Sequence, residues 1–301
     1  MYPLYRSKWN DFMHMDVKNN KSELMDIATH DVISVSPRKT IIGAVETMTK
    51  KGFRRLPVTD PGTHKIIGIV TAGDIINFMG GGEKFNLVSK KHNGNMISAL
   101  NDSVREIMST KAVTIRDNNK ISEVIDTIVN KKCGGLPITS EEGILRGIVT
   151  ERDILKVLCK NPNYLSVSDI MTKSPHVTSP DARICDVTKQ MISNKFRRLP
   201  VVSDDVLFGI VTAMDIMNYL GDGDVFREMT TGDVSDVMSV PVRKLISGEL
   251  YTTTPDESIS RVAKEMIEKG VGAFPVINNS NLVGVVTEFD LVKALSKEQS
   301  Q

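Results

Sequence analysis

Gly147-Ile148-Val149-Thr150, with Asp153 three residues after the threonine, is a short motif that recurs along this chain. The further copies are Gly68-Ile69-Val70-Thr71 with Asp74, Gly209-Ile210-Val211-Thr212 with Asp215, and Gly284-Val285-Val286-Thr287 with Asp290. A proline between hydrophobic residues precedes each threonine by 12 to 14 residues, at Pro57, Pro137, Pro200 and Pro275. Because both elements keep their order in every copy, the sequence indicates a fourfold internal repeat.

Each repeat combines helical and extended patterns. In repeat 2, hydrophobic residues step at helical spacing upstream of the proline, at Ile121, Val124, Ile125, Ile128 and Val129. The proline segment and the Gly-hydrophobic-hydrophobic-Thr segment are short apolar runs separated by turn-forming residues, which predicts a β-hairpin. A second helix is expected after each threonine. The predicted unit is therefore strand-helix-strand-strand-helix, and the fold class is α+β.

The repeats are of two alternating kinds, which indicates a duplicated pair. Repeats 1 and 3 carry Phe53-Arg54-Arg55 and Phe196-Arg197-Arg198 before the Leu-Pro element. Repeats 2 and 4 carry Gly134-Gly135 and Gly272-Ala273 at the arginine positions. They also have a glutamate directly after the threonine, at Glu151 and Glu288.

These patterns divide the chain into four domains with connecting segments. The predicted ranges are 1–21 for an N-terminal tail, 22–80, 100–160, 165–221 and 232–298 for the repeats, and 81–99 and 222–231 for linkers. The seam between the two pairs is placed near Asn161-Pro162-Asn163, and Gly80-Gly81-Gly82 is interpreted as a flexible joint. The tail holds the only tryptophan, Trp9, and is expected either to pack on the chain's own repeats or to dock to a partner.

Composition excludes several classes of function. The 301 residues include 38 Lys and Arg against 37 Asp and Glu, so no bulk charge favours nucleic acid or a membrane. No stretch reaches the roughly 18 apolar residues of a membrane helix. Three scattered cysteines, Cys133, Cys159 and Cys185, fit neither a disulfide framework nor a zinc site and favour a reducing cytoplasm. No catalytic or metal-binding motif is present, so we expect neither an enzyme nor a catalytic cofactor.

Residues 22–298 resemble the CBS domain family, named for cystathionine beta-synthase. Four such domains on one chain are similar to the gamma subunit of AMP-activated protein kinase and to stand-alone archaeal relatives. The resemblance implies that two CBS domains pack sheet to sheet as a pair, that two pairs form a disc, and that ligands bind in clefts between paired domains. It also implies binding rather than catalysis, with AMP, ADP or ATP as expected ligands.

The resemblance assigns roles to motif residues. The aspartates are expected to bind the ribose hydroxyls, and an ionised carboxylate can accept both hydrogen bonds of a cis-diol. The threonines, at helix starts, would face ribose or phosphate. The arginine pairs would bind phosphates, because the guanidinium fork donates two parallel hydrogen bonds. The sets are Asp74, Asp153, Asp215 and Asp290 for ribose; Thr71, Thr150, Thr212 and Thr287 for ribose or phosphate; Arg54, Arg55, Arg197 and Arg198 for phosphate; and Ser34, Thr114 and Thr252 for the base or ribose.

The chain departs from the family pattern at several points. Repeats 2 and 4 lack the basic pair, so phosphate binding there would need residues from neighbouring repeats. Val177 stands where a hydroxyl residue is expected in repeat 3. Met171 lies nine residues before Pro180, whereas Met238 lies 17 before Pro255, which predicts an insertion of eight near Val240 to Ser247 that covers or reshapes a cleft.

A Thr-x-x-Asp element also caps a helix without any ligand. Three hypotheses about function stay open from the sequence. The chain could be a nucleotide sensor that acts on a protein partner such as a kinase or enzyme, or a constitutive protein-binding scaffold. A third hypothesis keeps the sensor and replaces the nucleotide by another adenosyl compound such as S-adenosylmethionine. Either a monomer or a homodimer of discs fits the pattern.

Overall fold

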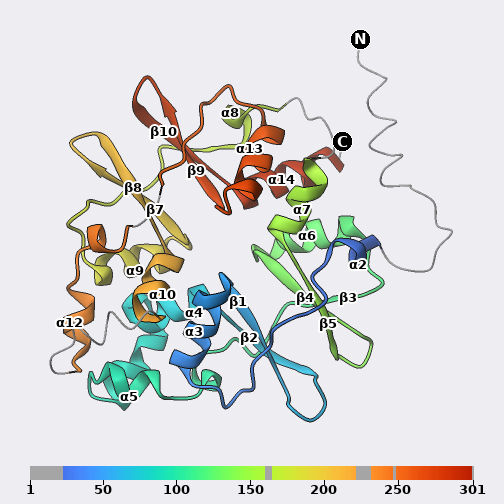
Figure 1. Cartoon of the computed structure of the whole chain (residues 1–301), viewed down its shortest axis with the longest axis vertical. Coiled ribbons are helices and arrows are strands. Elements are labelled where there is room, and N and C mark those ends of the chain that lie inside the picture. The colour runs from blue at the N-terminus through green and yellow to red at the C-terminus, as the bar shows by residue number, and fades with distance from the viewer. Residues whose placement is uncertain (1–22, 160–164, 222–231, 247–248, 300–301) are drawn as a thin grey trace.

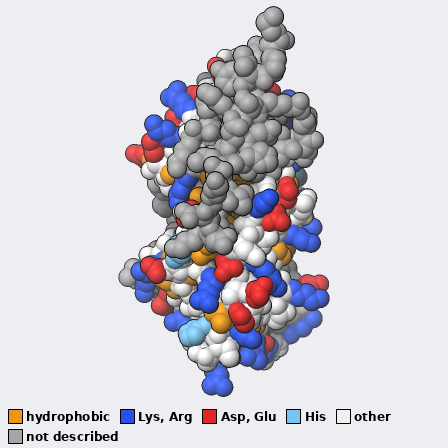
Figure 2. Space-filling view, turned by 90° about the vertical axis from the view of Figure 1, so that its right-hand side faces the viewer, with side chains coloured by type: hydrophobic (Ala, Val, Ile, Leu, Met, Phe, Trp, Pro, Cys, Tyr) orange, Lys and Arg blue, Asp and Glu red, His pale blue; other side chains and the backbone are white. Residues whose placement is uncertain are grey.

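The computed structural model describes residues 23–159, 165–221, 232–246 and 249–299. Within these ranges the four repeats surround a common centre in the order 1, 2, 4, 3 (Figure 1). Seen from the side, the outline is narrower, and basic and acidic side chains are interspersed on the visible face (Figure 2). The predicted tail, the seam near Asn161–Asn163 and the second linker lie outside the described residues.

Every repeat contains a helix, a two-stranded hairpin and a second helix, which confirms the predicted α+β class. The first helices are α3 (Ile41–Lys51), α6 (Ile121–Lys131), α9 (Ile184–Ser193) and α13 (Ile259–Glu268). The hairpins are β1 (Arg55–Thr59) with β2 (Ile66–Thr71), β4 (Gly135–Thr139) with β5 (Leu145–Thr150), β7 (Arg198–Ser203) with β8 (Val206–Thr212), and β9 (Ala273–Asn278) with β10 (Asn281–Thr287). The second helices are α4 (Ala72–Ile76), α7 (Glu151–Leu158), α10 (Ala213–Gly221) and α14 (Glu288–Gln299).

Local chemistry accounts for these elements. The buried face of α6 consists of Ile121, Val124, Ile125 and Ile128, as the helical spacing predicts. The hairpin of repeat 3 turns at Asp204 and Asp205, both with positive φ, and the same two-residue geometry occurs at Asn279 and Ser280 in repeat 4. Asp and Asn tolerate this left-handed backbone, whose twist matches that of the flanking strands.

The predicted first strand is short in every repeat. In repeat 2 it is β3 (Ile115–Arg116), which runs parallel to β4. In the other repeats a single parallel bridge takes its place, for example between Val35 and Val58. The first strand therefore contributes one edge contact to each hairpin rather than a full ladder.

The segment at the start of each repeat lies on the sheet of the other repeat in its pair. The helix α2 (Glu23–Ile27) leads to Thr29, which bridges to Ile148 in repeat 2, while Ser109 bridges to Ile69 in repeat 1. In the second pair, β6 (Thr172–Lys173) pairs with β10 of repeat 4. The predicted domain boundaries therefore assign each exchanged segment to one repeat, although in space it packs on the sheet of the other repeat.

This exchange corrects the predicted insertion in repeat 4. A side chain from each exchanged segment packs against the glycine of the hairpin motif, and in repeat 3 that contact joins Gly209 to Ile246. The corresponding contact in repeat 1 joins Gly68 to Met108. Ile246, rather than Met238, is therefore the counterpart of Met171, and it also lies nine residues before its proline. Met238 ends α12 (Val234–Met238), the counterpart of α5 (Met96–Leu100), and no insertion is present.

Two hydrophobic cores join the pairs. One contains buried residues of repeats 1 and 3, such as Ile76 and Leu220, and the other those of repeats 2 and 4, such as Leu155 and Val292. Helix α3 packs against α10, and α14 packs against α6 and α7. Repeats within a pair therefore meet through exchanged segments and sheets, whereas repeats of different pairs meet through helices.

The glycine triplet after α4 is packed rather than free, which corrects its interpretation as a flexible joint. Gly81 lies in the turn η1 (Asn77–Gly81), which packs on α9, and a Cβ added there would be 2.8 Å from the carbonyl oxygen of Thr188. Gly80 has a φ of 105° and lies against Met238. This segment reaches repeats 3 and 4 through close backbone contacts that larger residues would prevent.

Across the described ranges, every helix is too short or too polar to span a bilayer.

Candidate functional site

A cavity of about 680 Å³ opens where the four repeats meet. Its volume lies in the range of about 300–1,000 Å³ found for small-molecule sites. Two motif aspartates, Asp153 and Asp215, line it together with their threonines. Asp74 and Asp290 are not among the lining residues. Two of the four predicted ribose carboxylates therefore line this cavity, and two do not.

Each motif aspartate lies in the first turn of its helix and accepts hydrogen bonds from the threonine three residues before it. In repeat 2, the backbone N–H and the hydroxyl of Thr150 donate to Asp153 Oδ2 at 3.0 and 2.8 Å. The same bonds are 2.7 and 2.8 Å from Thr212 to Asp215, and 2.9 and 2.7 Å from Thr287 to Asp290. Capping occupies Oδ2 and leaves Oδ1 for other donors. Since a carboxylate accepts several hydrogen bonds, the capping and ribose interpretations are compatible.

The second carboxylate oxygen has different surroundings in different repeats. Asp153 Oδ1 accepts a hydrogen bond of 2.9 Å from Lys156, whose side chain is 55% exposed. Asp74 Oδ1 is held by Lys84. In the described part of the chain, Oδ1 of Asp215 has no hydrogen-bond partner. Burial outweighs the bonds from Thr212 and raises the pKa of Asp215 above its usual value, as it does for Asp290.

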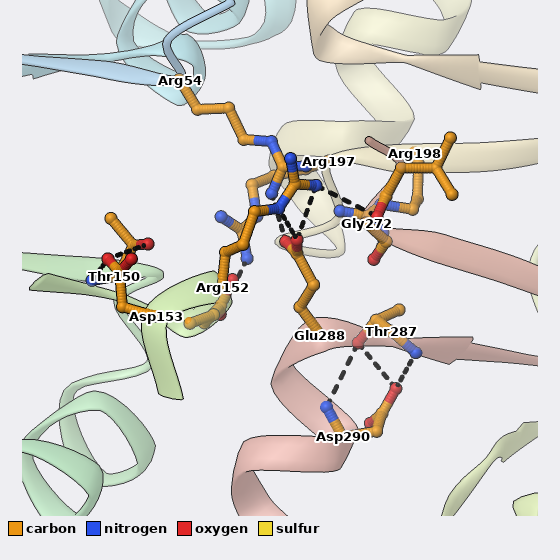
Figure 3. A network of polar contacts seen from close by, with 12 residues as sticks. Arg54, Thr150, Arg152, Asp153, Arg197, Arg198, Gly272, Thr287, Glu288 and Asp290 are labelled. Carbon is orange, nitrogen blue, oxygen red and sulfur yellow. Dashed lines mark hydrogen bonds and ion pairs between the residues drawn. The ribbon is translucent and has the colours of Figure 1, made fainter. Parts of the chain in front are cut away.

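Five arginines and two glutamates line the cavity. Figure 3 shows Arg54, Arg152, Arg197 and Arg198 gathered around Glu288. Arg54 of repeat 1 pairs with Glu288 of repeat 4, and Arg152 Nε donates to the other oxygen of Glu288 at 2.9 Å. Arg197 of repeat 3 lies 3.4 Å from a carboxylate oxygen of Glu151 in repeat 2. The remaining arginines are Arg55 and Arg198. This arginine cluster therefore carries three more positive than negative charges.

Glycines in repeats 2 and 4 make room for the arginines of repeats 1 and 3. A Cβ on Gly134 would lie 2.6 Å from Nη atoms of both Arg55 and Arg197. A Cβ on Gly272 would lie 2.5 Å from Nη2 of Arg54. The absence of a basic pair in repeats 2 and 4 is thus a requirement of the cluster, because the neighbouring repeats supply the arginines.

The cluster places charge where solvation is poor. Burial lowers the pKa of Arg55 to about 10, and the pKa of Arg198 to about 10 for the same reason. Burial opposes ionisation of Glu288 most strongly, yet Arg54, Arg152 and Arg198 outweigh it and lower its pKa. Within the described residues, the buried Nη1 of Arg55 has no hydrogen-bond partner. Buried donors of this kind are usually satisfied, so this nitrogen is suited to donate to an anion in the cavity.

The predicted base-facing hydroxyls lie elsewhere. Ser34 Oγ is 3.0 Å from Thr59 Oγ1 and lines a separate shallow pocket. Thr252 is exposed, and Thr114 is half-buried; neither lines the central cavity. Their residue-specific assignment stays a prediction.

The central cavity contains residues that sequence reasoning did not select. Ile33 and Phe53, each 36% exposed, line it, and Tyr251 lines it from repeat 4. Such apolar surfaces suit the faces of a purine base. Arg152 was also missed, although it lies inside the Thr-x-x-Asp motif. Its position directly after Glu151, between the motif threonine and aspartate, could have indicated that it lies at the site.

No group of metal-ligating side chains forms within the described ranges.

Comparison with known proteins agrees with the repeat and the cavity. The model of the CBS domain matches residues 24–81, 104–160, 167–222 and 234–297. A protein of Methanocaldococcus jannaschii, MJ1225, is 38% identical over 264 residues, covering 87% of this chain and 94% of that protein. A 33.4 kDa protein from the ribosomal RNA operon of Thermofilum pendens is 28% identical over 258 residues, covering 85% of each chain.

Solved structures give the same result. The crystal structure of MJ1225, described as a proposed archaeal homolog of g-AMPK, superposes with a TM-score of 0.86 at 37% identity and covers 90% of this chain and 99% of that one. A Pyrococcus horikoshii protein at 18% identity shares the fold, with a TM-score of 0.57 and 89% of this chain and 97% of that one covered.

Proposed function

Because this chain belongs to the CBS domain family, we propose that it is a non-catalytic regulatory protein that binds AMP, ADP or ATP between its paired repeats. Nucleotide binding would change its affinity for a protein partner. The likeness to MJ1225, a proposed g-AMPK homolog, supports this class of function. The finer assignment to adenine nucleotides rests on the central cavity.

One observation carries the proposal: the cavity combines a ribose-type carboxylate with a phosphate-type cation cluster. Asp153 and Asp215 each offer carboxylate oxygens, and the arginine cluster lies between their repeats. Among the described residues, the buried Nη1 of Arg55 has no hydrogen-bond partner. A nucleotide would place its ribose on the aspartate, its base against the apolar side chains and its phosphates on the arginines.

The arginine cluster favours phosphate over S-adenosylmethionine. That compound carries a positive sulfonium group at the position where a nucleotide carries phosphate. Five arginines facing two glutamates would repel this charge, since like charges in a poorly solvated site raise the free energy of binding. The same cluster argues against an empty scaffold, because among the described residues the buried Nη1 of Arg55 has no acceptor, and buried donors are usually satisfied.

Binding of phosphate could alter the contacts between pairs. Arg54 and Arg197 each pair with a glutamate from a repeat in the other pair. A phosphate that competes for these guanidinium groups would bind more tightly when the ion pairs with the glutamates are broken than when they are formed. Differential affinity of this kind is what a ligand needs to shift a conformational equilibrium.

Isothermal titration of the purified chain with AMP, ADP, ATP, adenosine and S-adenosylmethionine tests the proposal. We expect binding of the phosphorylated ligands to be tighter than that of adenosine, and S-adenosylmethionine to be weakest. Nucleotide should also raise the melting temperature, because it stabilises the folded state by mass action. Binding of S-adenosylmethionine alone would overturn the nucleotide assignment, and no binding of any adenosyl ligand would favour the scaffold.

A further inference from the structure

The motif aspartate of repeat 1, Asp74, is held by a side chain of the protein itself. Lys84 Nζ forms an ion pair with Asp74 Oδ1 and also donates to the carbonyl oxygen of Ile107. The side chain of Asp74 is only 10% exposed and that of Lys84 25%. Ser109 Oγ lies 3.4 Å from the same oxygen. With Thr71 on Oδ2, both oxygens of this carboxylate are engaged.

The chain positions Lys84 through several contacts. The backbone N–H of Lys84 donates to Asn77 Oδ1 at 2.7 Å. Just before it, Gly80 and Gly81 pack closely against residues of repeats 4 and 3. Lys84 therefore reaches Asp74 from a segment that is fixed at both the side chain and the backbone, unlike a mobile surface lysine.

The motif aspartates of repeats 2 and 3 lack this arrangement. Oδ1 of Asp215 has no hydrogen-bond partner in the described structure, and the lysine near Asp153 is one helical turn away on the same helix and largely exposed. The sequence shows the same difference. Gly80-Gly81-Gly82-Glu83-Lys84-Phe85 aligns with Gly221-Asp222-Gly223-Asp224-Val225-Phe226, so repeat 3 has valine where repeat 1 has Lys84.

We propose that Lys84 closes the Asp74 cleft by taking the place of the ribose hydroxyls, which makes this cleft a latent adenosine site. The chain then binds fewer adenosine-type ligands than it has Thr/Asp motifs. The inference rests on the proposed nucleotide-binding function and adds which cleft is closed and by which group. Removing the ammonium group should open the cleft to adenosine or its nucleotides.

Titration with adenosine, which carries no charge, tests directly whether Lys84 closes the site at Asp74. Lys84→Met keeps the apolar stem and removes the ammonium group, and we expect it to bind one more adenosine per chain than the unmodified protein. Lys156→Met removes the lysine beside Asp153 and serves as the matched control, with an unchanged number of sites. Adding Asp74→Asn to Lys84→Met should abolish the extra site, because a neutral amide does not replace the carboxylate as ribose acceptor.

A second test needs no loss of Lys84 and covers the case in which Lys84→Met does not fold. Asp74→Asn in the otherwise unmodified chain should leave the number of adenosine sites unchanged, whereas Asp215→Asn should remove one. Loss of a site in Asp74→Asn, or no gain in a folded Lys84→Met variant, would overturn the latent site while leaving the proposed function intact. If no variant binds adenosine, AMP, ADP or ATP, both the latent site and the proposed function are overturned.

Discussion

Arg54 in repeat 1 and Glu288 in repeat 4 form an ion pair across the centre of the molecule, between repeats that do not adjoin around the ring. Arg197 and Glu151 make the corresponding contact between repeats 3 and 2 at 3.4 Å. The charges that hold the centre together are thus the ones that a bound phosphate would meet. This relationship links stability to ligand binding.

Glu288→Gln should destabilise the fold and strengthen ATP binding relative to adenosine. The variant removes the carboxylate from Arg54 and Arg152, so the lost charged hydrogen bonds should cost on the order of 1.5–3 kcal/mol of unfolding free energy. The freed arginines then become available to phosphate. Urea unfolding and parallel titrations measure the two effects, and Glu268→Gln, an exposed helix position, is the control.

The effect of Glu288→Gln on stability should depend on pH. The arginines lower the folded-state pKa of Glu288 below its reference value of 4.5. A depressed carboxyl pKa contributes stability that is present above the unfolded value and is lost as pH falls through the folded pKa. The stability difference between the native chain and Glu288→Gln should therefore shrink below about pH 4.5. A difference that stays constant at acidic pH would contradict the ionised pair.

Replacing Arg55 and Arg198 by alanine should weaken ATP and ADP more than adenosine. The lost bonds are to phosphate, whereas the ribose and base contacts remain, so we expect a loss of roughly 1.5–3 kcal/mol for the nucleotides. Titration with adenosine is the internal control. An equal relative loss for ATP and adenosine would show that both arginines are structural.

Gly134→Ala should disturb the arginine cluster without breaking a helix or strand. The new Cβ would lie 2.6 Å from Nη atoms of Arg55 and Arg197, so these flexible groups must move. We expect weaker ATP binding, unchanged adenosine binding and little change in melting temperature. Gly62→Ala, in an exposed hairpin turn, is the matched control. Unchanged ATP affinity would mean that the arginines do not hold phosphate in this position.

Asp215→Asn should gain stability relative to the native chain as the pH rises. Burial raises the folded-state pKa of Asp215 above 3.8, so its contribution is fully present below that pH and is lost as pH rises through the folded pKa. Ionisation therefore costs stability near neutral pH, and the variant avoids this cost. The unfolding free energy of Asp215→Asn relative to that of the native chain, measured by urea unfolding, should be higher at pH 7 than at pH 4. An equal difference between the two proteins at pH 4 and at pH 7 would show that the carboxylate ionises without a cost in stability.

The sequence predicted the elements that depend on local chemistry. The stripe at Ile121, Val124, Ile125 and Ile128 and the turn at Asp204-Asp205 each carry their own geometric signal, and both are confirmed. The exchange of segments was not predictable in this way. Ile246 was overlooked because methionine occupies the corresponding position in the other repeats, and its role appears only once it lies against Gly209.

The site was predicted in its residue types but not in its connections. The arginine pairs and motif aspartates were selected individually, whereas the ion pair of Arg54 with Glu288 joins residues 234 positions apart. Gly134 was interpreted as a missing charge, although it provides space for charges from other repeats. Lys84 carried no motif at all. Its meaning depends on a tertiary contact with Asp74 that spacing alone does not reveal.

The circular order of the repeats has a consequence for unfolding. In a linear repeat array the two end repeats each lack a neighbour, and such arrays need terminal caps and can fray from their ends. Here each repeat has one neighbour through exchanged segments and another through helix packing, so the arrangement closes on itself and has no end repeat. Separation of any one repeat must break both kinds of interface at once. The chain should therefore melt as a single cooperative unit, with the calorimetric enthalpy equal to the van't Hoff enthalpy.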